Sequence, residues 1–318
     1  MTRRVALTCG DPNGIGPEIA LKALAALEDD GSIGLTLFGP REAFLGAARN
    51  LGFVDLLERT PLRCVGKLEP GAFQPGTVSA AAGASAVASA TAAIEACISG
   101  EFDAVVAGPH HETAIAQAGI SFSGYPSLVA RVCGQSEHSV FMLLVGGGLR
   151  IVHATLHESV ATALSRITPD LVVAATEAGL RACRAMGIGQ PKVALFGINP
   201  HASEGRLFGP EDEERVVPAA QMLRARGVDV TGPLGADVLL ADRKHDLYVA
   251  MLHDQGHIPV KLLAPQAASA ISIGAGVLLA STGHGSAMDI AGQGTARPDA
   301  LLRSLRLVGG ICRPAEAR

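Results

Sequence analysis

The sequence predicts an α/β fold in which a largely parallel sheet carries helices on its faces. Short β-branched runs bounded by glycine or proline recur along the chain, and segments with helical patterns lie between them. Strands that alternate with helices build parallel sheets, because the crossover between two parallel neighbours has room for a helix. The length of 318 residues is enough for two domains, each with its own core.

Seven segments have the apolar, β-branched character of buried strands. They are Val5–Thr8, Leu35–Phe38, Ala104–Ala107, Phe141–Val145, Arg150–Thr155, Val193–Phe196 and Leu247–Leu252. Four segments between them have helical patterns, namely Pro17–Leu27, Ala81–Ile98, Leu171–Met186 and Glu211–Arg226. The first of these helices has its proline in the first turn, where no backbone N–H bond is needed. Ala81–Ile98 is rich in alanine and serine, but its apolar positions favour a helix packed closely on a sheet over a linker.

The composition is that of a compact globular protein. Apolar residues make up 48% of the chain and 38 residues are glycine, which argues against a disordered chain. The net charge is −4 and the arginines are scattered without a basic stripe, which argues against nucleic acid as the main partner.

Cysteine usage and the first residues favour a cytoplasmic protein. The cysteines have no Cys-x-x-Cys pair and no regular spacing, which favours reduced, mostly buried thiols. They stand at positions 9, 64, 97, 133, 183 and 312. Asp11 and Pro12 interrupt the first apolar run too early for a signal peptide. The apolar stretch 141–152 is too short to cross a bilayer, and we expect no membrane partner.

Three histidines on separate loops are candidates for a metal site. His157 stands in Ala-Thr-Leu-His-Glu, His201 in Asn-Pro-His-Ala-Ser-Glu-Gly, and His253 in Leu-His-Asp-Gln-Gly. Neutral imidazole is the commonest protein ligand for a divalent metal such as zinc, and three protein ligands with an open position are typical of a catalytic site. The alternative is that each is a separate, hydrogen-bonded loop histidine.

Two histidine pairs have the i, i+4 spacing, His153 with His157 and His253 with His257. The first pair lies on a predicted strand, where four residues span roughly 13 Å, so both rings cannot reach one ion at ~2.1 Å. The second pair has a glycine between its members and a proline after it, which predicts a loop. We therefore expect at most one histidine of each pair to bind a metal.

Two loops after predicted strands are candidate ligand loops. Gly10–Glu18 leads from a strand into a helix, but its glycine spacing is not that of Gly-x-Gly-x-x-Gly, so a tight turn and a ligand loop are equal alternatives. Gly108–Thr113 follows a buried strand and places His111 at the carboxyl end, where open α/β sheets bind ligands.

Two further segments have polar residues in unusual places. Lys261 enters an apolar stretch, where it is either a solvated surface residue or, near a metal, a partner for a carboxylate or a proton. Gly283–Gly294 combines glycine turns and a predicted helix start with two polar residues. That combination suits a dinucleotide, and the alternative is a capped helix.

Taken together, these segments resemble the 4-hydroxythreonine-4-phosphate dehydrogenase family of metal-dependent NAD enzymes. The resemblance covers nearly the whole chain in the same order, and Asn-Pro-His-Ala-x-Glu-Gly with His-Asp-Gln-Gly is highly specific in combination. It implies a two-domain isocitrate/isopropylmalate dehydrogenase-like fold with the active site in the interdomain cleft. It also implies that His157, His201 and His253 bind the metal, and that a homodimer shares each active site.

Several positions depart from the family pattern at its phosphate site. Tyr125 and Pro126 replace a His-Thr pair, and Glu112 replaces a lysine. An ungapped alignment places Ala270 and Leu279 where the family has a substrate-binding asparagine and arginine. Because a phosphate dianion needs cations and hydrogen-bond donors, these replacements predict a substrate without phosphate.

A narrower branch, the terephthalate dihydrodiol dehydrogenases, is closely similar in residues 109–115, 122–128, 196–205 and 244–257. Enzymes of this branch oxidise 1,2-dihydroxy-3,5-cyclohexadiene-1,4-dicarboxylate to protocatechuate, CO₂ and NADH. The resemblance therefore implies an NAD oxidoreductase that oxidises and decarboxylates a cis-dihydrodiol dicarboxylate. Zinc is the metal expected for three nitrogen ligands, with Fe²⁺, Mg²⁺ or Mn²⁺ as alternatives, and NADP in place of NAD stays open.

The resemblance and the local patterns together give the expected site residues. Asp237 and Asp254 could orient a ligand histidine or act as the base, although Asp237 could instead cap a helix. The catalytic candidates are Lys261, Asp237 and Asp254. The substrate-binding candidates are His111, Tyr125, Ser127 and His257. The cofactor-binding candidates are Gly283, His284, Asp289 and Gly292.

The expected domains are 1–122 with 266–318 on the nucleotide-binding side, and 123–265 for the metal site and dimer formation. Two other functions stay open. One is a dehydrogenase of a phosphorylated four-carbon hydroxy acid, such as 4-hydroxythreonine, erythronate or threonate 4-phosphate. The other is a metal-binding or nucleotide-binding protein without catalytic activity.

Overall fold

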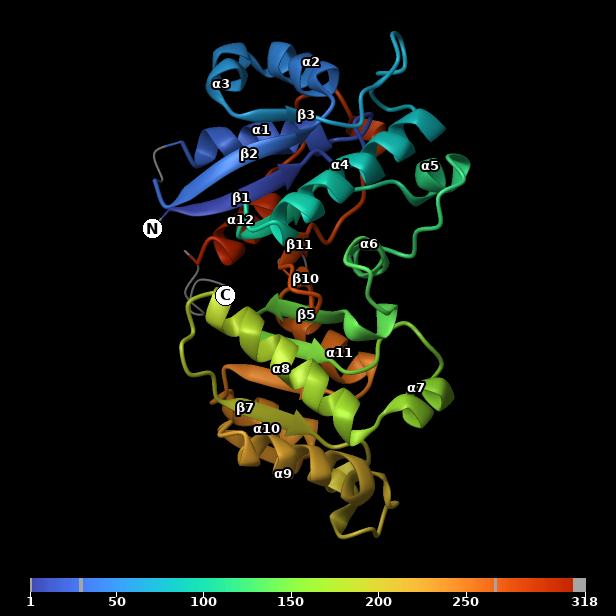
Figure 1. Cartoon of the computed structure of the whole chain (residues 1–318), viewed down its shortest axis with the longest axis vertical. Coiled ribbons are helices and arrows are strands. Elements are labelled where there is room, and N and C mark those ends of the chain that lie inside the picture. Colours follow the sequence, from blue (N-terminus) through green and yellow to red (C-terminus); the bar gives the residue numbers. More distant parts are fainter. Residues whose placement is uncertain (1, 29–30, 266–267, 311–318) are drawn as a thin grey trace. The chain divides into compact units, whose positions relative to one another are not determined.

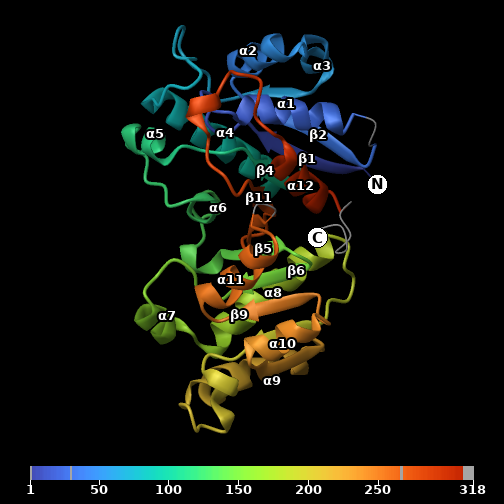
Figure 2. The same cartoon turned by 180° about the vertical axis from the view of Figure 1, so that it is seen from behind.

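The computed structural model describes residues 2–28, 31–265 and 268–310. They form two compact units, drawn in Figures 1 and 2. Unit 1 comprises the described residues of Met1–Glu137 and Ala275–Cys312, and unit 2 comprises those of His138–Gly274. The division expected from the sequence, 1–122 with 266–318 and 123–265, stays a prediction, and residues 266–267 and 311–318 lie outside the described part.

Unit 1 contains a parallel sheet with the strand order β3-β2-β1-β4-β11. The strands are β1 (Arg3–Thr8), β2 (Ile33–Gly39), β3 (Leu62–Cys64), β4 (Ala104–Ala107) and β11 (Leu279–Ser281). β4 is buried along its whole length, as expected for an apolar strand in a sheet with both faces covered.

Helices cover both faces of this sheet. α4 (Ala80–Ile98) packs on β1, β2 and β4, and α1 (Gly16–Ala26) with α12 (Asp299–Val308) lies on the other face (Figures 1 and 2). Within the described ranges, α4 alone is long and apolar enough to cross a membrane, but more than half of it is buried and it is a core helix of the sheet. The other elements are α2 (Arg41–Leu51), α3 (Val54–Arg59), α5 (Glu112–Gln117), α6 (Tyr125–Val132) and the 3-10 turn η4 (Met288–Ile290).

Unit 2 contains a mixed sheet with the strand order β10-β5-β6-β9-β7-β8. Its strands are β5 (Phe141–Gly146), β6 (Leu149–His153), β7 (Val193–Phe196), β8 (Val230–Leu234), β9 (Leu247–Ala250) and β10 (Ser269–Ile273). β5 is antiparallel to both β10 and β6, whereas β6, β9, β7 and β8 are parallel. The expected largely parallel arrangement is confirmed, and β5 is the exception, because Gly147 and Gly148, with φ of 59° and 78°, turn β5 directly into β6 as a hairpin.

Helices also lie on both faces of the sheet in unit 2 (Figures 1 and 2). α8 (Pro169–Ala185) and α9 (Val217–Ala225) cover one face, and α10 (Ala236–Asp242) and α11 (His253–Leu263) cover the other. The remaining elements are α7 (Val160–Arg166), the 3-10 turns η1 (Glu137–Ser139) and η2 (Pro200–Glu204), and the π-helical turn η3 (Asp212–Val216).

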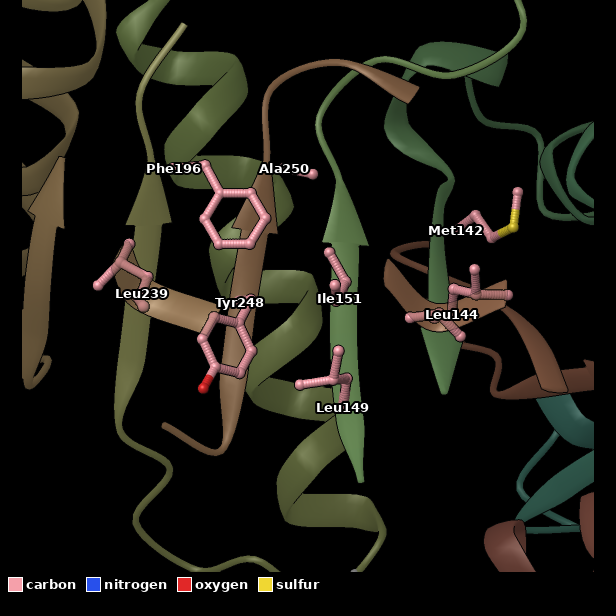
Figure 3. Packing of buried hydrophobic residues seen from close by; sticks show 10 residues of the cluster. Met142, Leu144, Leu149, Ile151, Phe196, Leu239, Tyr248 and Ala250 are labelled. Atoms are coloured by element: carbon pink, nitrogen blue, oxygen red, sulfur yellow. The ribbon is translucent and has the colours of Figure 1, made fainter. Parts of the chain in front are cut away.

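Figure 3 shows the core between this sheet and helices α10 and α11. Leu239 of α10 and Val260 of α11 belong to the same buried cluster as side chains from four neighbouring strands. The strand residues are Met142, Leu144, Leu149, Ile151, Ala194, Phe196, Tyr248 and Ala250. This core fixes the strands whose carboxyl ends carry the candidate metal ligands.

The cysteines of the described ranges are free, but only Cys9 and Cys183 among them are buried, so the expectation of mostly buried thiols is wrong. The described cysteines are Cys9, Cys64, Cys97, Cys133 and Cys183. Cys312 lies outside the described residues.

Candidate functional site

The candidate metal ligands follow three adjacent parallel strands of unit 2. β9 lies between β6 and β7, and all three strands run in the same direction. His157 follows β6, His253 follows β9 and His201 follows β7. Because the carboxyl ends of neighbouring parallel strands meet at one edge of the sheet, the topology brings the three segments to an edge where open α/β sheets bind ligands.

Hydrogen bonds join these segments to one another. Thr155 Oγ1 donates to Met251 O at 2.6 Å, which ties the segment after β6 to the end of β9. Gln255 Oε1 accepts from the backbone N–H groups of Met251 and Leu252, and its Nε2 donates to Gly197 O at 2.7 Å. Gln255 therefore connects the start of α11 to the end of β7.

His157 and His253 lie close together. Their ring centroids are 5.6 Å apart, a separation that suits two imidazoles bound to one ion at ~2.1 Å. His253 Nδ1 lies 2.7 Å from Asp254 Oδ1, so Nδ1 carries the proton and Nε2 keeps its lone pair. Burial lowers the pKa of His157, which keeps this imidazole neutral as a metal ligand requires. The donor set of this pair fits a divalent metal.

His201 stands apart from this pair. Its ring lies 6.1 Å from the ring of Phe208, and no ring contact between the described residues joins it to His157 or His253. In the same part of the chain, no three or more His, Cys, Asp or Glu side chains are grouped so that they could hold a metal ion. A single chain thus brings two of the three histidines together, and the three-histidine site stays a prediction.

The segment of His253 is a helix, and its prediction as a loop is wrong. α11 begins at His253, where Gln255 Oε1 accepts from the N–H of the preceding Leu252, and the helix continues through Pro259. As a result the rings of His253 and His257 stack, with centroids 3.7 Å apart and planes 10° apart. Lys261 follows one turn later on the same face. The distance between His253 and His257 therefore does not exclude that both rings bind the same metal ion.

His153 is considered in the sequence analysis only as a possible metal ligand, but the structure shows it as a buried hydrogen-bond partner of His257. It is 1% exposed, its Nδ1 lies 3.3 Å from Met142 O, and its Nε2 lies 3.1 Å from His257 Nδ1. Burial lowers the pKa of His153 to about 3, so the ring is neutral. Because Met142 O only accepts, His153 Nδ1 carries the proton and its Nε2 accepts from His257 Nδ1. Burial also lowers the pKa of His257, to about 4.

The catalytic candidates lie on the surface of unit 2. Lys261 is exposed on α11 and Asp254 is exposed beside His253. Asp237 is exposed in the first turn of α10, after β8, where no hydrogen bond or ion pair to the candidate histidines is formed among the described residues. Their catalytic roles stay predictions.

The cofactor candidates lie in unit 1, on the loop that follows β11. β11 is parallel to β4, so this loop and the loop Gly108–Thr113 leave the sheet at the same edge. Both loops line an open hollow of about 460 Å³. Its lining residues are His110, His111, Glu112, Thr113, Gly285, Ser286, Ala287, Met288 and Asp289. Gly283, His284 and Gly292 are exposed on the same loop, and the expected helix start is only the short turn η4.

Three substrate-binding candidates in unit 1 already use their polar atoms within the protein. Tyr125 is 6% exposed and its hydroxyl donates to Gly108 O at 2.7 Å. Ser127 Oγ donates to a carbonyl of its own turn at 2.8 Å. His111 caps α5, where its Nδ1 accepts from Ala114 N at 3.4 Å. Contact of these three residues with a substrate stays a prediction.

Tyr125 belongs to a cluster of three edge-to-face rings. His110 lies 4.8 Å from Phe122 and 5.0 Å from Tyr125, and Phe122 lies 5.8 Å from Tyr125. Such edge-to-face pairs are favourable because the positive ring edge meets the negative face. The Tyr125 ring is therefore held between two other rings, and the expectation that it replaces a phosphate-binding histidine stays a prediction.

The loop Gly10–Glu18 supports the neighbouring loop after β11, which carries the cofactor candidates. Ile15 N donates to Ser286 O at 2.9 Å, and a side chain on Gly14 would meet Ser286 at 2.7 Å. Glu18 accepts from Ala296 N at 2.7 Å. The loop is therefore a tight turn that packs against a candidate ligand loop, and whether it also binds a ligand stays open.

Comparison with known proteins connects this geometry to characterised enzymes. Residues 42–308 match the family described as pyridoxal phosphate biosynthetic protein PdxA. The chain is 58% identical to a 1,2-dihydroxy-3,5-cyclohexadiene-1,4-dicarboxylate dehydrogenase from Comamonas sp, over 96% of this chain and 97% of that protein. It is 38% identical to a D-threonate 4-phosphate dehydrogenase from Cupriavidus necator, over 95% of each chain.

Solved structures agree with these relatives. A terephthalate 1,2-cis-dihydrodiol dehydrogenase from Burkholderia xenovorans LB400 is 46% identical, covers 98% of each chain and has a TM-score of 0.82. A 4-hydroxythreonine-4-phosphate dehydrogenase from Burkholderia phymatum is 33% identical over 98% of each chain, with a TM-score of 0.85. The resemblance stated from the sequence motifs is confirmed.

Proposed function

The chain belongs to the family of pyridoxal phosphate biosynthetic protein PdxA, and we propose that it is a metal-dependent NAD dehydrogenase of a terephthalate-derived cis-dihydrodiol dicarboxylate. The products are protocatechuate and CO₂. The observation that carries the proposal is the 58% identity over 96% of the chain to the Comamonas enzyme. A cytoplasmic enzyme of terephthalate degradation is the corresponding biological role.

The side chains of unit 1 support a substrate without phosphate. Glu112 is exposed in the lining of the 460 Å³ hollow and adds a negative charge there. Tyr125 is buried with its hydroxyl bound to Gly108 O, and Leu279 is fully buried in β11. A phosphate dianion would meet a carboxylate and an aromatic ring where it needs cations and free donors.

His157, His253 and His201 would hold the metal, and zinc is the first choice, with Fe²⁺, Mg²⁺ or Mn²⁺ as alternatives. When bound, the metal supplies Lewis-acid chemistry that lowers the pKa of a substrate hydroxyl. Asp254 holds the His253 ring through Nδ1 and so keeps Nε2 available.

The reaction needs one proton to leave the secondary hydroxyl of the substrate while the hydride on the same carbon passes to NAD⁺. The resulting β-keto acid loses CO₂, the bonding pair enters the ring, and one proton returns to the enolate oxygen to complete the aromatic product. Lys261, Asp254 and Asp237 are the candidates to carry this proton, and Lys261 also suits a substrate carboxylate. His257 lies between His253 and Lys261 on the same helix face and would contact the substrate.

We assign the nicotinamide cofactor to unit 1. Gly283, His284, Asp289 and Gly292 stand on the loop after β11, and Asp289 lines the open hollow with His111 of the neighbouring loop. The parallel strands β4 and β11 end at this hollow, which is the expected position for a nucleotide in an open α/β sheet.

We further propose a homodimer in which the second copy supplies His201 to the pair of His157 and His253. The proposal is supported by the separation of His201 from this pair within one chain. Large apolar side chains of unit 2 are exposed near these elements, as expected for a surface that a partner covers. They are Leu207 (72%), Phe208 (47%), Ile258 (54%) and Leu262 (78%).

Steady-state rates with purified, metal-loaded enzyme test the substrate. We expect NAD⁺ reduction with the cis-dihydrodiol dicarboxylate and release of CO₂, and no reduction with 4-hydroxythreonine or threonate 4-phosphate. The identity of 38% to the D-threonate 4-phosphate dehydrogenase favours the phosphate esters as the second candidate. If the enzyme turned over only the phosphate esters, the proposed diol substrate would be wrong and the esters would take its place.

Mixed dimers test the shared site. His201→Ala and His253→Ala should each be inactive alone, because each lacks a metal ligand in both sites. Co-refolded mixtures should recover about a quarter of wild-type activity at most, because half of the dimers are mixed and each mixed dimer has one complete site. Mixtures of His157→Ala with His253→Ala should stay inactive, because both ligands come from the same copy. Equal rates in the two mixtures would contradict the shared site.

A further inference from the structure

The turn that carries His201 has an unusual backbone. Glycine tolerates positive φ angles, but here most members of a run of positive φ angles carry a Cβ atom, and Gly205, at 63°, is its one glycine. These residues are His201 (53°), Ala202 (52°), Ser203 (69°), Glu204 (43°) and Arg206 (77°). A left-handed run of this kind is unfavourable for L-residues, so the turn depends on contacts from outside itself.

Asp212 makes those contacts. It is fully buried at the start of η3, and its Oδ1 accepts from Ile198 N at 2.7 Å. Its Oδ2 accepts from Asn199 N at 3.0 Å and from Ser203 Oγ at 2.8 Å. The three donors lie on both sides of His201 in the sequence, so one carboxylate closes the turn around the histidine.

These three hydrogen-bond donors compensate the negative charge of the Asp212 carboxylate. In the described part of the chain, Asp212 takes part in no ion pair, so N–H and O–H groups alone compensate the buried carboxylate. Charge-assisted hydrogen bonds of this type are stronger than neutral ones. A neutral side chain at position 212 could not satisfy the same three donors equally well.

Neighbouring side chains complete the frame of the turn. Asn199 Nδ2 donates to Ser203 Oγ at 3.1 Å and to Glu211 Oε2 at 2.7 Å. Gly197 and Gly209 permit the close approach, since a Cβ on Gly197 would meet Ala202 at 2.8 Å and one on Gly209 would meet Glu211 at 2.3 Å. Both ends of the segment are therefore fixed to η3, and η3 continues into α9, which packs on α8.

We propose that Asp212 is the positioning residue that holds the left-handed turn in the conformation with which His201 reaches the metal. The inference rests on the proposed function in taking His201 as a metal ligand. It assigns to Asp212 no contact with the substrate or the metal. Because Asp212 orders the turn before the metal binds, metal binding does not have to supply the free energy of ordering it.

Hydrogen exchange of the metal-free, full-length protein tests the clamp itself. In Asp212→Asn, one amide oxygen replaces two carboxylate oxygens, and the new NH₂ group faces a donor. We expect the amides of Ile198 and Asn199 to exchange at least tenfold faster than in the wild type. Glu213→Gln is the matched control, because it makes the same charge change on the exposed neighbouring residue of η3. Unchanged exchange in Asp212→Asn would overturn the clamp.

Zinc titration of the same metal-free proteins tests the coupling to the metal. We expect Asp212→Asn to weaken Zn²⁺ binding about 10–100-fold, the usual effect of losing a residue that orients a metal ligand. Ser203→Ala removes a single bond and should weaken binding less, and it keeps the inference testable if Asp212→Asn does not fold. Glu213→Gln should bind Zn²⁺ like the wild type.

His201→Ala separates the two proposals. If His201→Ala loses Zn²⁺ affinity while Asp212→Asn and Ser203→Ala bind normally, the metal site stands and the role of Asp212 is overturned. If His201→Ala also binds Zn²⁺ normally, His201 is not a ligand, and both the proposed metal site and this inference fail.

Discussion

Asp11 is a buried carboxyl group in the first loop of unit 1. Its Oδ1 accepts from Asn13 N at 2.9 Å, and its Oδ2 is buried without a hydrogen-bond partner among the described residues. Burial raises the pKa of Asp11 to about 6. Because the folded-state pKa lies above the ordinary value, the protein loses stability as the pH rises towards and through about 6, when this carboxyl ionises.

Asp11→Asn should remove this pH dependence. We expect the variant to match the wild type near pH 4 and to exceed its free energy of unfolding at pH 7 by up to about 3 kcal/mol, since the pKa is raised by about two units. The amide oxygen of asparagine can still accept from Asn13 N. Urea unfolding of both proteins between pH 4 and 7 measures the difference, and parallel curves over this range would show that Asp11 does not carry it.

Gly256 makes room for His153 beneath α11. A Cβ at position 256 would lie 2.3 Å from His153 Nε2, the atom that faces His257. We expect Gly256→Ala to lower the free energy of unfolding by about 1–3 kcal/mol through overpacking, although alanine favours a helix. Chemical denaturation measures this loss. Gly189→Ala is the control, because nothing lies within 4 Å of a Cβ there, and an equal effect of both substitutions would exclude the contact with His153 as the cause.

At the scale of elements, α1 holds the end of the loop after β11 through a charge pair. Lys22 Nζ donates to Glu18 Oε1 at 2.8 Å and to the carbonyls of Gly294 and Ala296 at 2.8 and 2.7 Å. Glu18 in turn accepts from the backbone N–H groups of both loop residues. One pair on consecutive helical turns therefore satisfies four backbone groups of a segment that lies far away in the sequence.

Lys22→Met should destabilise the protein by about 3 kcal/mol, because it leaves the buried Glu18 without its cation. Glu28→Gln is the comparison, since it breaks the exposed pair with Arg59 and should cost no more than about 1 kcal/mol. Guanidinium unfolding gives both values. A loss for Lys22→Met no larger than that for Glu28→Gln would mean that the loop does not depend on this pair.

The predicted elements with strong patterns are confirmed, and the errors have local causes. The apolar runs Val5–Thr8 and Ala104–Ala107 are strands, and Ala81–Ile98 is a helix on the sheet. α11 was missed because glycine and proline suggest a loop, whereas Gln255 and the packing of Val260 in the core favour the helix. The hairpin at Gly147 was missed because a buried antiparallel strand has the same apolar pattern as a parallel one.

At the scale of the whole molecule, bound zinc should raise thermal stability only when the ligand pair is intact. An ion that binds the native state alone stabilises it by about 2.7 kcal/mol at 100-fold excess over its Kd. We expect a higher Tm with zinc for the chelator-treated wild type and for His284→Ala, whose side chain is in unit 1. His157→Ala and His253→Ala should show no such increase. If zinc raised the Tm of both variants as much as that of the wild type, His157 and His253 would not be metal ligands.

The sequence predicted the candidate metal ligands as separate motifs, and the strand order explains why they belong to one edge of a sheet. It did not predict that His201 stands apart from the other two within one chain, and it did not predict the left-handed turn that carries this histidine. The hydrogen bonds of His153 could not be predicted from the sequence either, because its partners, Met142 O and His257, are known only from the folded structure. Motifs identify residue types, whereas tautomers and turn handedness depend on packing.

The three packed rings of His110, Phe122 and Tyr125 limit which single substitutions this part of unit 1 tolerates. The hydroxyl of Tyr125 also ties α6 to the end of β4 through Gly108 O. Exchanging Tyr125 for a smaller residue would open a void and release that carbonyl before any new ligand contact is gained. A change of shape at this place would therefore require the three rings to be replaced together, since each fills the space beside the other two.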